Sequence, residues 1–187
     1  MADLVTSTAV KAFLSIAHTD DDTLIASLVN YVSSAIESYC HREFTSGAHT
    51  EYLDGGESLI VKHLPITAIT GIYDTFDSDL VVDADNYDYD GGAGLIYPSQ
   101  SSEFYWGGEW SAGRRRWKVV YTGGYAAVPD DVSLAACTWI ADIYEARDDL
   151  KSGSLGDKGF LRASAVSIHP MPDRCQGILD HYRLVAI

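Results

Sequence analysis

Closely spaced aspartates are the first residues in this sequence whose pattern suggests chemistry. Asp83, Asp85, Asp88 and Asp90 offer the kind of oxygen ligands that a calcium-binding loop takes from one short segment. An EF-hand loop that began at Asp83 would need glycine at its sixth position and glutamate at its twelfth, and the sequence has Asp88 and Gly94 there. We therefore interpret these aspartates as a solvated acidic hairpin, and we predict no metal site and no cofactor.

Two other pairs are candidates for catalysis. Glu103 and Glu109 could be paired carboxylates, which retaining glycosidases hold about 5 Å apart across a cleft, but nothing in the sequence indicates a cleft. Cys40 and His41 are neighbours on a predicted helix, so their side chains diverge and do not favour a nucleophile–base dyad. The 6 histidines lack a ligand spacing such as His-Glu-Xaa-Xaa-His. We expect no enzymatic activity.

Arg114, Arg115 and Arg116 form the basic cluster of the chain. They could touch DNA, pair with carboxylates of a neighbouring subunit, or be solvated at the start of a strand. Nearby aromatic residues, among them Trp106 and Trp110, could stack on sugars or bases, anchor a protein interface, or pack locally. Both groups are therefore candidate interface residues.

Composition limits these possibilities. The formal net charge of −14 argues against a protein that grips phosphates through clustered Lys and Arg, and against binding to an anionic membrane. It does not exclude an acidic surface past which DNA slides. No apolar run approaches the ~18 residues of a membrane span, and the N-terminus lacks a secretory signal. Cys40, Cys137 and Cys175 fit neither a disulfide framework nor a zinc site, so we expect buried thiols and folding in a reducing cytosol.

Hydrophobic periodicity predicts an α+β fold with a mainly helical core of antiparallel helices. We expect one domain over residues 1–187, with the helical core at 6–44 and 128–150. A β-rich insertion is predicted at 48–122, and a C-terminal loop and helix at 151–187. The predicted helical core residues are Leu24, Leu28, Val32, Ile36, Tyr39, Val132, Ala136, Trp139, Ile140, Ile143 and Tyr144.

Within the insertion, segments 50–54, 58–64 and 66–74 resemble strands, and segment 86–98 resembles a hairpin with its turn at Gly91 to Gly94. Residues 104–113 are rich in aromatics and glycine and suggest an exposed loop. A closing strand is expected at 116–121, before Gly123 and Gly124.

Short motifs follow one another along the chain in a fixed order. The set begins with an aspartate-rich turn, a helix that ends in Cys-His-Arg-Glu-Phe at 40–44, and a Glu-Tyr-Leu-Asp-Gly strand at 51–55. It continues with an apolar strand containing Pro65, a Tyr-Asp pair at 73–74 and Tyr-Thr-Gly-Gly-Tyr at 121–125. Val-Pro-Asp at 128–130 and a proline-led helix ending in Tyr-Arg at 183 complete it. This ordered set resembles the head-to-tail connector (adaptor) family of long-tailed bacteriophages. The insertion at 75–113 and the acidic balance depart from the family pattern.

The resemblance implies a structural protein of the virion neck, made in the host cytoplasm. Subunits of the family form a ring, typically of twelve, that docks under the portal protein and meets the stopper or tail-completion protein. Genomic DNA would pass through its lumen without sequence-specific binding, and no membrane is involved. The resemblance adds C-terminal residues to the candidate interface, which then comprises Arg114, Arg115, Arg116, Trp106, Trp110, Met171, Arg174, Tyr182 and Arg183.

Two alternatives stay open at this point. The chain could be another ring protein of the neck or tail, such as a stopper or tail-completion subunit, although these are usually dominated by strands. It could also be a glycan-binding module that uses the aromatic insertion, in which case Trp106 and Trp110 would contact sugar.

Overall fold

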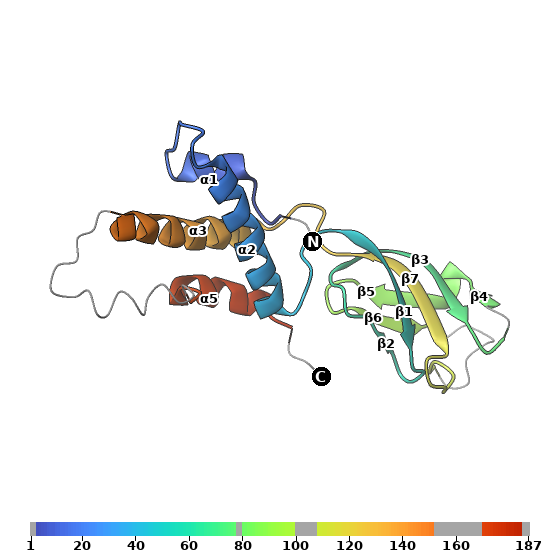
Figure 1. The fold of residues 1–187 in the computed structure, drawn as a ribbon. Helices are drawn as coiled ribbons and strands as arrows, with labels where there is room; N and C mark the ends of the chain where they lie inside the picture. Colours follow the sequence, from blue (N-terminus) through green and yellow to red (C-terminus); the bar gives the residue numbers. More distant parts are fainter. Residues whose placement is uncertain (1–2, 78–79, 100–107, 152–169, 185–187) are drawn as a thin grey trace. The chain divides into compact units, whose positions relative to one another are not determined.

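A computed structural model describes residues 3–77, 80–99, 108–151 and 170–184. The chain divides into two compact units: residues 1–41 with 128–187 form a helical unit, and residues 42–127 form a β unit (Figure 1). The β unit is thus an insertion between the second and third helices, and the α+β class predicted from the sequence is confirmed. Whether the chain behaves as one domain, as the sequence analysis expects, stays a prediction.

The helical unit begins with helices α1, Ser7–Phe13, and α2, Asp22–Cys40. The Thr6 hydroxyl caps α1 by accepting a hydrogen bond from the Ala9 N–H at 3.2 Å. Helix α2 is followed by His41, whose φ of 53° places it in the left-handed conformation that ends many helices.

Helix α3, Asp130–Lys151, packs against α1, α2 and α5. Helix α5, Asp173–Leu179, is continued by the 3₁₀ turn η2, Asp180–Tyr182. In Figure 1, α3 and α5 lie side by side and run in opposite directions, while α2 crosses them. None of the helices in the described parts of the chain has the length and apolar character that a membrane crossing requires.

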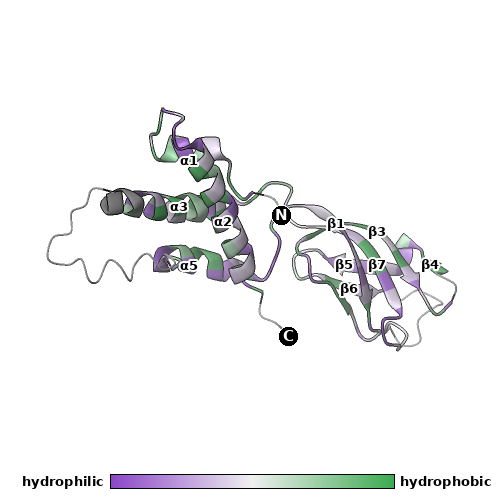
Figure 2. Cartoon of the chain, in the orientation of Figure 1, coloured by the Kyte–Doolittle hydropathy of each residue, from purple (hydrophilic) through white to green (hydrophobic). Residues whose placement is uncertain are grey.

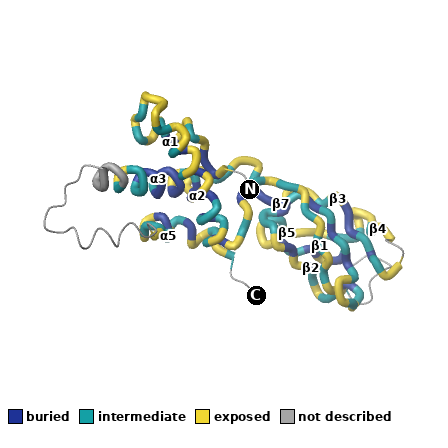
Figure 3. Tube along the Cα trace, in the orientation of Figure 1, coloured by how far each residue is buried: buried dark blue, intermediate teal, exposed yellow. Residues whose placement is uncertain are grey.

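The helical core differs in register from the sequence prediction on α2. Its buried stripe is Ile25, Val29, Val32, Ile36 and Cys40, which recur every three or four residues. Helix α2 packs against α1 and α3, and the Cys40 thiol at its end lies 3.7 Å from the Leu179 carbonyl of α5. The predicted residues Leu24, Leu28 and Tyr39 flank this stripe and are half-buried, as are Ile143 and Tyr144 on α3. The other predicted core residues are buried, namely Val32, Ile36, Val132, Ala136, Trp139 and Ile140. Figure 3 shows buried stretches on both α2 and α3.

The β unit contains a four-stranded antiparallel sheet in the order β1-β7-β3-β4. Its strands are β1, Gly47–Leu53; β3, Ile66–Asp74; β4, Leu80–Val82; and β7, Trp117–Gly123. Strand β7 alternates strictly between buried and half-buried residues, because one of its faces looks into the core. Figure 2 shows hydrophobic stretches on β3 and β7, the two central strands.

A second sheet has the order β2-β6-β5. It contains β2, Leu59–Ile60; β5, Tyr87–Asp90; and β6, Leu95–Pro98. The hairpin predicted at 86–98 is confirmed, and the Asp90 carboxylate closes its turn by accepting hydrogen bonds from the N–H groups of Gly92 and Ala93 at 2.9 and 3.0 Å. The short turn η1, Ala84–Asn86, precedes β5. Strand β4 and turn η1 were not predicted from the sequence.

The core of the β unit draws side chains from both sheets: Leu59, Val61, Ile66, Ile72, Ile96, Trp110, Trp117, Val119 and Tyr121. Trp110 is only 1% exposed, so the prediction of an exposed loop over 104–113 is wrong at this residue. Its indole N–H donates to the Ile96 carbonyl at 2.9 Å, and its ring meets that of Trp117 edge-on at 4.8 Å. These contacts hold Trp110 between the two sheets.

The Tyr-Thr-Gly-Gly-Tyr motif closes one end of the β unit. The Gly124 N–H donates to the Pro65 carbonyl at 2.9 Å, and the Tyr125 N–H donates to the Phe44 carbonyl at 2.9 Å. A Cβ on Gly123 would lie 2.3 Å from the His63 carbonyl oxygen, and one on Gly124 would lie 2.4 Å from that of Thr45. Two other parts of the chain therefore approach β7 at a distance that only glycine permits.

Gly124→Ala should destabilise the β unit by about 2 kcal/mol or more, because Gly124 has φ +100° and its new Cβ would meet the Thr45 carbonyl. Gly56→Ala is the matched control, since nothing lies within 4 Å of its Cβ position. Urea unfolding followed by tryptophan fluorescence would measure both. Equal midpoints for the two variants would contradict the close approach described here.

Candidate functional site

The arginine cluster ends in a partly buried ion pair. Arg116 directs its guanidinium at the Asp74 carboxylate, with Nε 2.9 Å from Oδ1 and Nη2 2.6 Å from Oδ2. The Asp74 side chain is 8% exposed and that of Arg116 is 24% exposed. The Phe76 N–H also donates to Asp74 at 3.0 Å, and the guanidinium lies 5.5 Å from the Trp117 ring centroid. This two-point geometry is the stronger form of an arginine–carboxylate contact.

The electrostatics of this pair follow from its burial. Burial on its own would raise the pKa of Asp74, but the hydrogen bonds from Arg116 and from the Phe76 N–H outweigh it and lower the pKa of this carboxyl. The hydrogen bond to Asp74 likewise raises the pKa of Arg116. A small pocket beside the pair is lined by Asp77, Leu80, Val81, Val82 and Ser111 together with Asp74, Arg116 and Trp117.

The three arginines therefore do not act as one basic patch. Arg116 is engaged within its own chain, which none of the three readings from the sequence anticipated. Arg115 places its guanidinium 5.3 Å from the Tyr52 ring centroid. The backbone N–H of Arg115 donates a hydrogen bond to the Asp54 carboxylate at 2.6 Å. Arg114 and Arg115 are exposed at the end of the β unit, and their role in an interface stays a prediction.

Three of the four C-terminal interface candidates, Arg174, Tyr182 and Arg183, contact other helices of the helical unit. Arg174 binds Asp142 on α3, and the Tyr182 hydroxyl lies 2.9 Å from both carboxylate oxygens of Asp131. The Arg183 guanidinium lies 5.3 Å from the ring centroid of Tyr39 on α2. Met171 accepts a hydrogen bond from the Gln176 side chain at 2.9 Å. The contacts of Arg174, Tyr182 and Arg183 attach α5 and η2 to α2 and α3, whereas that of Met171 is local to α5.

The two aromatic interface candidates, Trp106 and Trp110, also have different outcomes. Trp110 is a core residue and has no surface to offer a partner, so the prediction of Trp110 as an interface or sugar-binding residue is wrong. Its indole is held from within by Ile96 and Trp117. Trp106 and Glu103 lie outside the described residues. The glycan-binding alternative therefore loses one of its two anchors.

Other sequence interpretations have clear outcomes. Asp83, Asp85, Asp88 and Asp90 are all exposed, as expected of a solvated hairpin. Cys40, Cys137 and Cys175 are buried free thiols, as predicted. Burial raises the pKa of the Cys137 and Cys175 thiols, which keeps them protonated and unreactive.

The fold assembles one cluster that the sequence analysis did not find. His49 lies on β1 and His63 on the segment between β2 and β3, and their rings stack with centroids 3.7 Å apart at 7°. Burial and the neighbouring His63 lower the pKa of His49 and favour its neutral form. Glu43 completes the cluster, and potential ligand atoms of the three side chains lie within 4.8 Å of one another. His49 and His63 are brought together by the approach of β1 and of the β2–β3 connection to β7, and the sequence spacing does not encode that approach.

Comparison with known proteins matches residues 3–185 of the chain to the family described as "Head completion protein". Since nearly the whole chain is matched, the agreement covers both units. No curated protein matches the sequence significantly.

Solved structures of a gene transfer agent (GTA) particle contain chains with this fold. One is described as "Neck of empty GTA particle computed with C6 symmetry"; it has TM-score 0.58 and 15% identity, over 97% of this chain and 90% of that one. Another, "Neck of native GTA particle computed with C12 symmetry", has TM-score 0.54 and 18% identity, over 97% and 92% of the two chains. A chain in "Virion of native gene transfer agent (GTA) particle" has TM-score 0.54 and 17% identity, over 98% and 93%.

Arg116→Ala should lower the stability of the β unit by about 2–4 kcal/mol at pH 7, because it leaves the Asp74 carboxylate buried and unpaired. Arg114→Ala, which removes an exposed arginine two residues away, is the control and should change stability by less than about 0.5 kcal/mol. Urea unfolding monitored by tryptophan fluorescence measures both. Equal losses for the two variants would contradict a structural role for the pair.

The ion pair of Asp74 and Arg116 should also make the stability of the β unit depend on pH. A carboxyl whose pKa is lowered in the folded state contributes stability above its unfolded pKa of about 3.9, and this contribution is lost as pH falls through the folded pKa. Asp74→Asn should therefore be less stable than the wild type at pH 7, and the difference should shrink below about pH 4. A difference that stays constant from pH 7 to pH 3 would show that the charge of Asp74 is not responsible.

Proposed function

The chain belongs to the head completion protein family and is a structural protein of the virion neck, and we propose that it is the connector subunit that joins the portal to the next protein of the neck. In this proposal its subunits close into a ring whose lumen continues the DNA channel. The ring docks on the portal with one face and offers the other to a stopper or tail-completion protein.

One observation carries the proposal. The match to the neck chain of the GTA particle extends over 97% of this chain and 92% of that chain. It therefore includes the helical unit, the inserted β unit and the C-terminal helix, in the same order. A protein that had borrowed only one of these units for another purpose would match over a part of its length.

The number of subunits in the ring is part of the proposal. The related neck structures were computed with C12 and C6 symmetry, and we infer twelve subunits for this chain. Subunits in such a ring make head-to-tail contacts, in which two different surfaces of the subunit meet and the rotation closes.

Exposed apolar side chains of the helical unit suit such contacts. Phe13 on α1 is 49% exposed, Tyr31 on α2 is 46% exposed and Leu134 on α3 is 51% exposed. A neighbouring subunit that packed on these helices would cover these side chains and remove their apolar surface from water. We infer that neighbouring subunits meet through the helical unit and that the β unit projects toward a partner.

The negative charge of the chain is consistent with a channel whose wall does not bind the DNA that passes through it. Each subunit carries a formal charge of −14, so a ring would present a large excess of negative charge to the phosphates. Repulsion prevents DNA from adhering to the wall as it moves. In this proposal the protein acts through assembly alone and carries out no catalysis, and it is made in the host cytoplasm before it joins the virion.

Mixing the full chain with the portal protein encoded nearest to it should give stacked rings in negative-stain electron microscopy. The portal alone and the chain alone are the two reference samples, because a connector can remain monomeric until a portal templates its ring. Rings on the narrow end of the portal support the proposal. A well-folded chain that never associates with the portal would contradict it and favour a stopper or another neck protein.

Leu134→Asp should abolish or strongly reduce ring formation on the portal, because it places a charge in the inferred subunit contact. Asp is tolerated in the first turns of a helix, so the melting temperature of the isolated chain should hardly change. Ile60→Asp is a matched control on the β unit, since Ile60 is 52% exposed and Leu134 is 51% exposed. Mass photometry of the portal mixtures measures assembly. Equal loss for both variants, or for Ile60→Asp alone, would contradict the assignment of the helices to the ring contact.

A further inference from the structure

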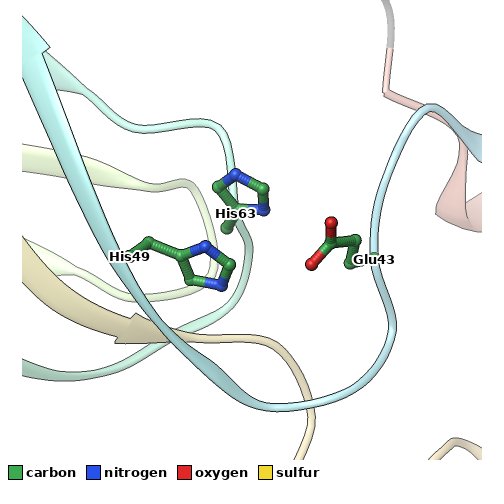
Figure 4. A group of neighbouring side chains, drawn as sticks. All are labelled: Glu43, His49 and His63. Atoms are coloured by element: carbon green, nitrogen blue, oxygen red, sulfur yellow. The ribbon is translucent and has the colours of Figure 1, made fainter. Parts of the chain in front are cut away.

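Three segments of the β unit bring Glu43, His49 and His63 together. Glu43 precedes β1, His49 lies on β1, and His63 lies in the connection from β2 to β3. In Figure 4 the Glu43 carboxylate faces the two imidazole rings across a short gap. Among the described residues, this is the group of three His, Cys, Asp or Glu side chains whose ligand atoms all lie within 4.8 Å of one another.

We propose that Glu43, His49 and His63 bind a divalent transition-metal ion, of which Zn²⁺, Co²⁺ and Ni²⁺ are the best matches. Two imidazole nitrogens and one carboxylate oxygen form a donor set that suits these ions, whereas Ca²⁺ and Mg²⁺ prefer oxygen ligands alone. Three protein ligands leave a fourth position of a tetrahedral site free. Glu43 is exposed and both histidines are half-buried, so that position is open to water or to a donor from a partner.

The backbone around the cluster is fixed by independent contacts. The His63 N–H donates to the Tyr121 hydroxyl at 3.1 Å, and Arg42 donates to the neighbouring Leu64 carbonyl at 2.5 Å. His49 is directly opposite Tyr121 in the pairing of β1 with β7. Phe44, the neighbour of Glu43, is fully buried and stacks on Tyr125. Metal binding therefore requires adjustment of side chains and no rearrangement of the sheet.

The geometry defines what that adjustment is. Ligands about 2.0–2.2 Å from a tetrahedral metal lie about 3.4 Å apart, so the donor atoms must close from their present separation of up to 4.8 Å. The stacked rings are 7° from parallel, and they must tilt so that their nitrogen lone pairs converge on one point. The exposed Glu43 side chain can complete the remaining approach by changing rotamer.

Local charge favours a cation over an empty cluster. His49 experiences the negative charges of both Glu43 and Glu51. Glu51 is held on the same strand as His49, where it accepts hydrogen bonds from the Tyr121 hydroxyl and from the Lys62 N–H. A bound ion would neutralise part of this charge and would join the segment before β1 to the β2–β3 connection.

Isothermal titration of the full chain, prepared without a histidine tag, with Zn²⁺ and Ni²⁺ tests the proposal. One equivalent should bind, and Co²⁺ should give the strong visible absorption of a four-coordinate site. His49→Ala and His63→Ala should each weaken binding at least tenfold, and Glu43→Gln should weaken it by a smaller factor. His181→Ala removes an exposed histidine of the helical unit and should leave binding unchanged.

A second readout separates loss of the site from loss of the fold. The melting temperature should rise with added Zn²⁺ in the wild type and in His181→Ala, and this rise should be lost in His63→Ala. Because Glu43 is exposed, Glu43→Gln should keep the wild-type melting temperature in the absence of metal, and it still tests the site if a histidine variant fails to fold. Absence of one-equivalent binding below about 1 mM, or equal binding by the wild type, Glu43→Gln and either folded histidine variant, would overturn the proposal.

Discussion

The close approach of three chain segments at Gly123 and Gly124 is the constraint on which the β unit depends. Here the segment that leads into β1 and the connection from β2 to β3 both contact the end of β7. A Cβ on either glycine would lie within 2.4 Å of a carbonyl oxygen from one of these two segments. Hydrogen bonds from Gly124 and Tyr125 hold the two segments there. Without this closure, β1 and β3 would lack a fixed register on β7, and His49 and His63 would have no reason to stack.

The elements with strong local patterns could be predicted from the sequence, and the contacts between residues far apart in the chain could not. Helix α2 and the hairpin turn at Gly91 to Gly94 have signals that lie within a few residues, so they were predicted. Strand β4 has three residues and was missed. The aromatic segment around Trp110 was read as exposed because glycines and tryptophans in a row suggest a loop, and only the second sheet gives Trp110 its buried place. The same limit applies to Arg116, whose partner Asp74 is 42 residues away.

The functional reading depends on the order of the motifs more than on any single one. The resemblance to phage connectors rests on segments that now have structural roles, such as the Tyr-Asp pair whose Asp74 binds Arg116 and the Tyr-Thr-Gly-Gly-Tyr segment that closes the β unit. These motifs are therefore signs of the fold. The family match over residues 3–185 is consistent with the family that the motifs indicated. The residues that would form the subunit contacts of a ring are different ones, exposed on the helices. Sequence patterns say little about which exposed residues a partner covers.

A reconstruction of the chain bound to its portal, at a resolution that traces side chains, would test the central claim of a ring built through the helical unit. The proposed function predicts twelve subunits whose neighbours meet through α1, α2 and α3, with Phe13, Tyr31 and Leu134 covered at the contact. A ring held together only by β units, with these three side chains still facing solvent, would contradict it.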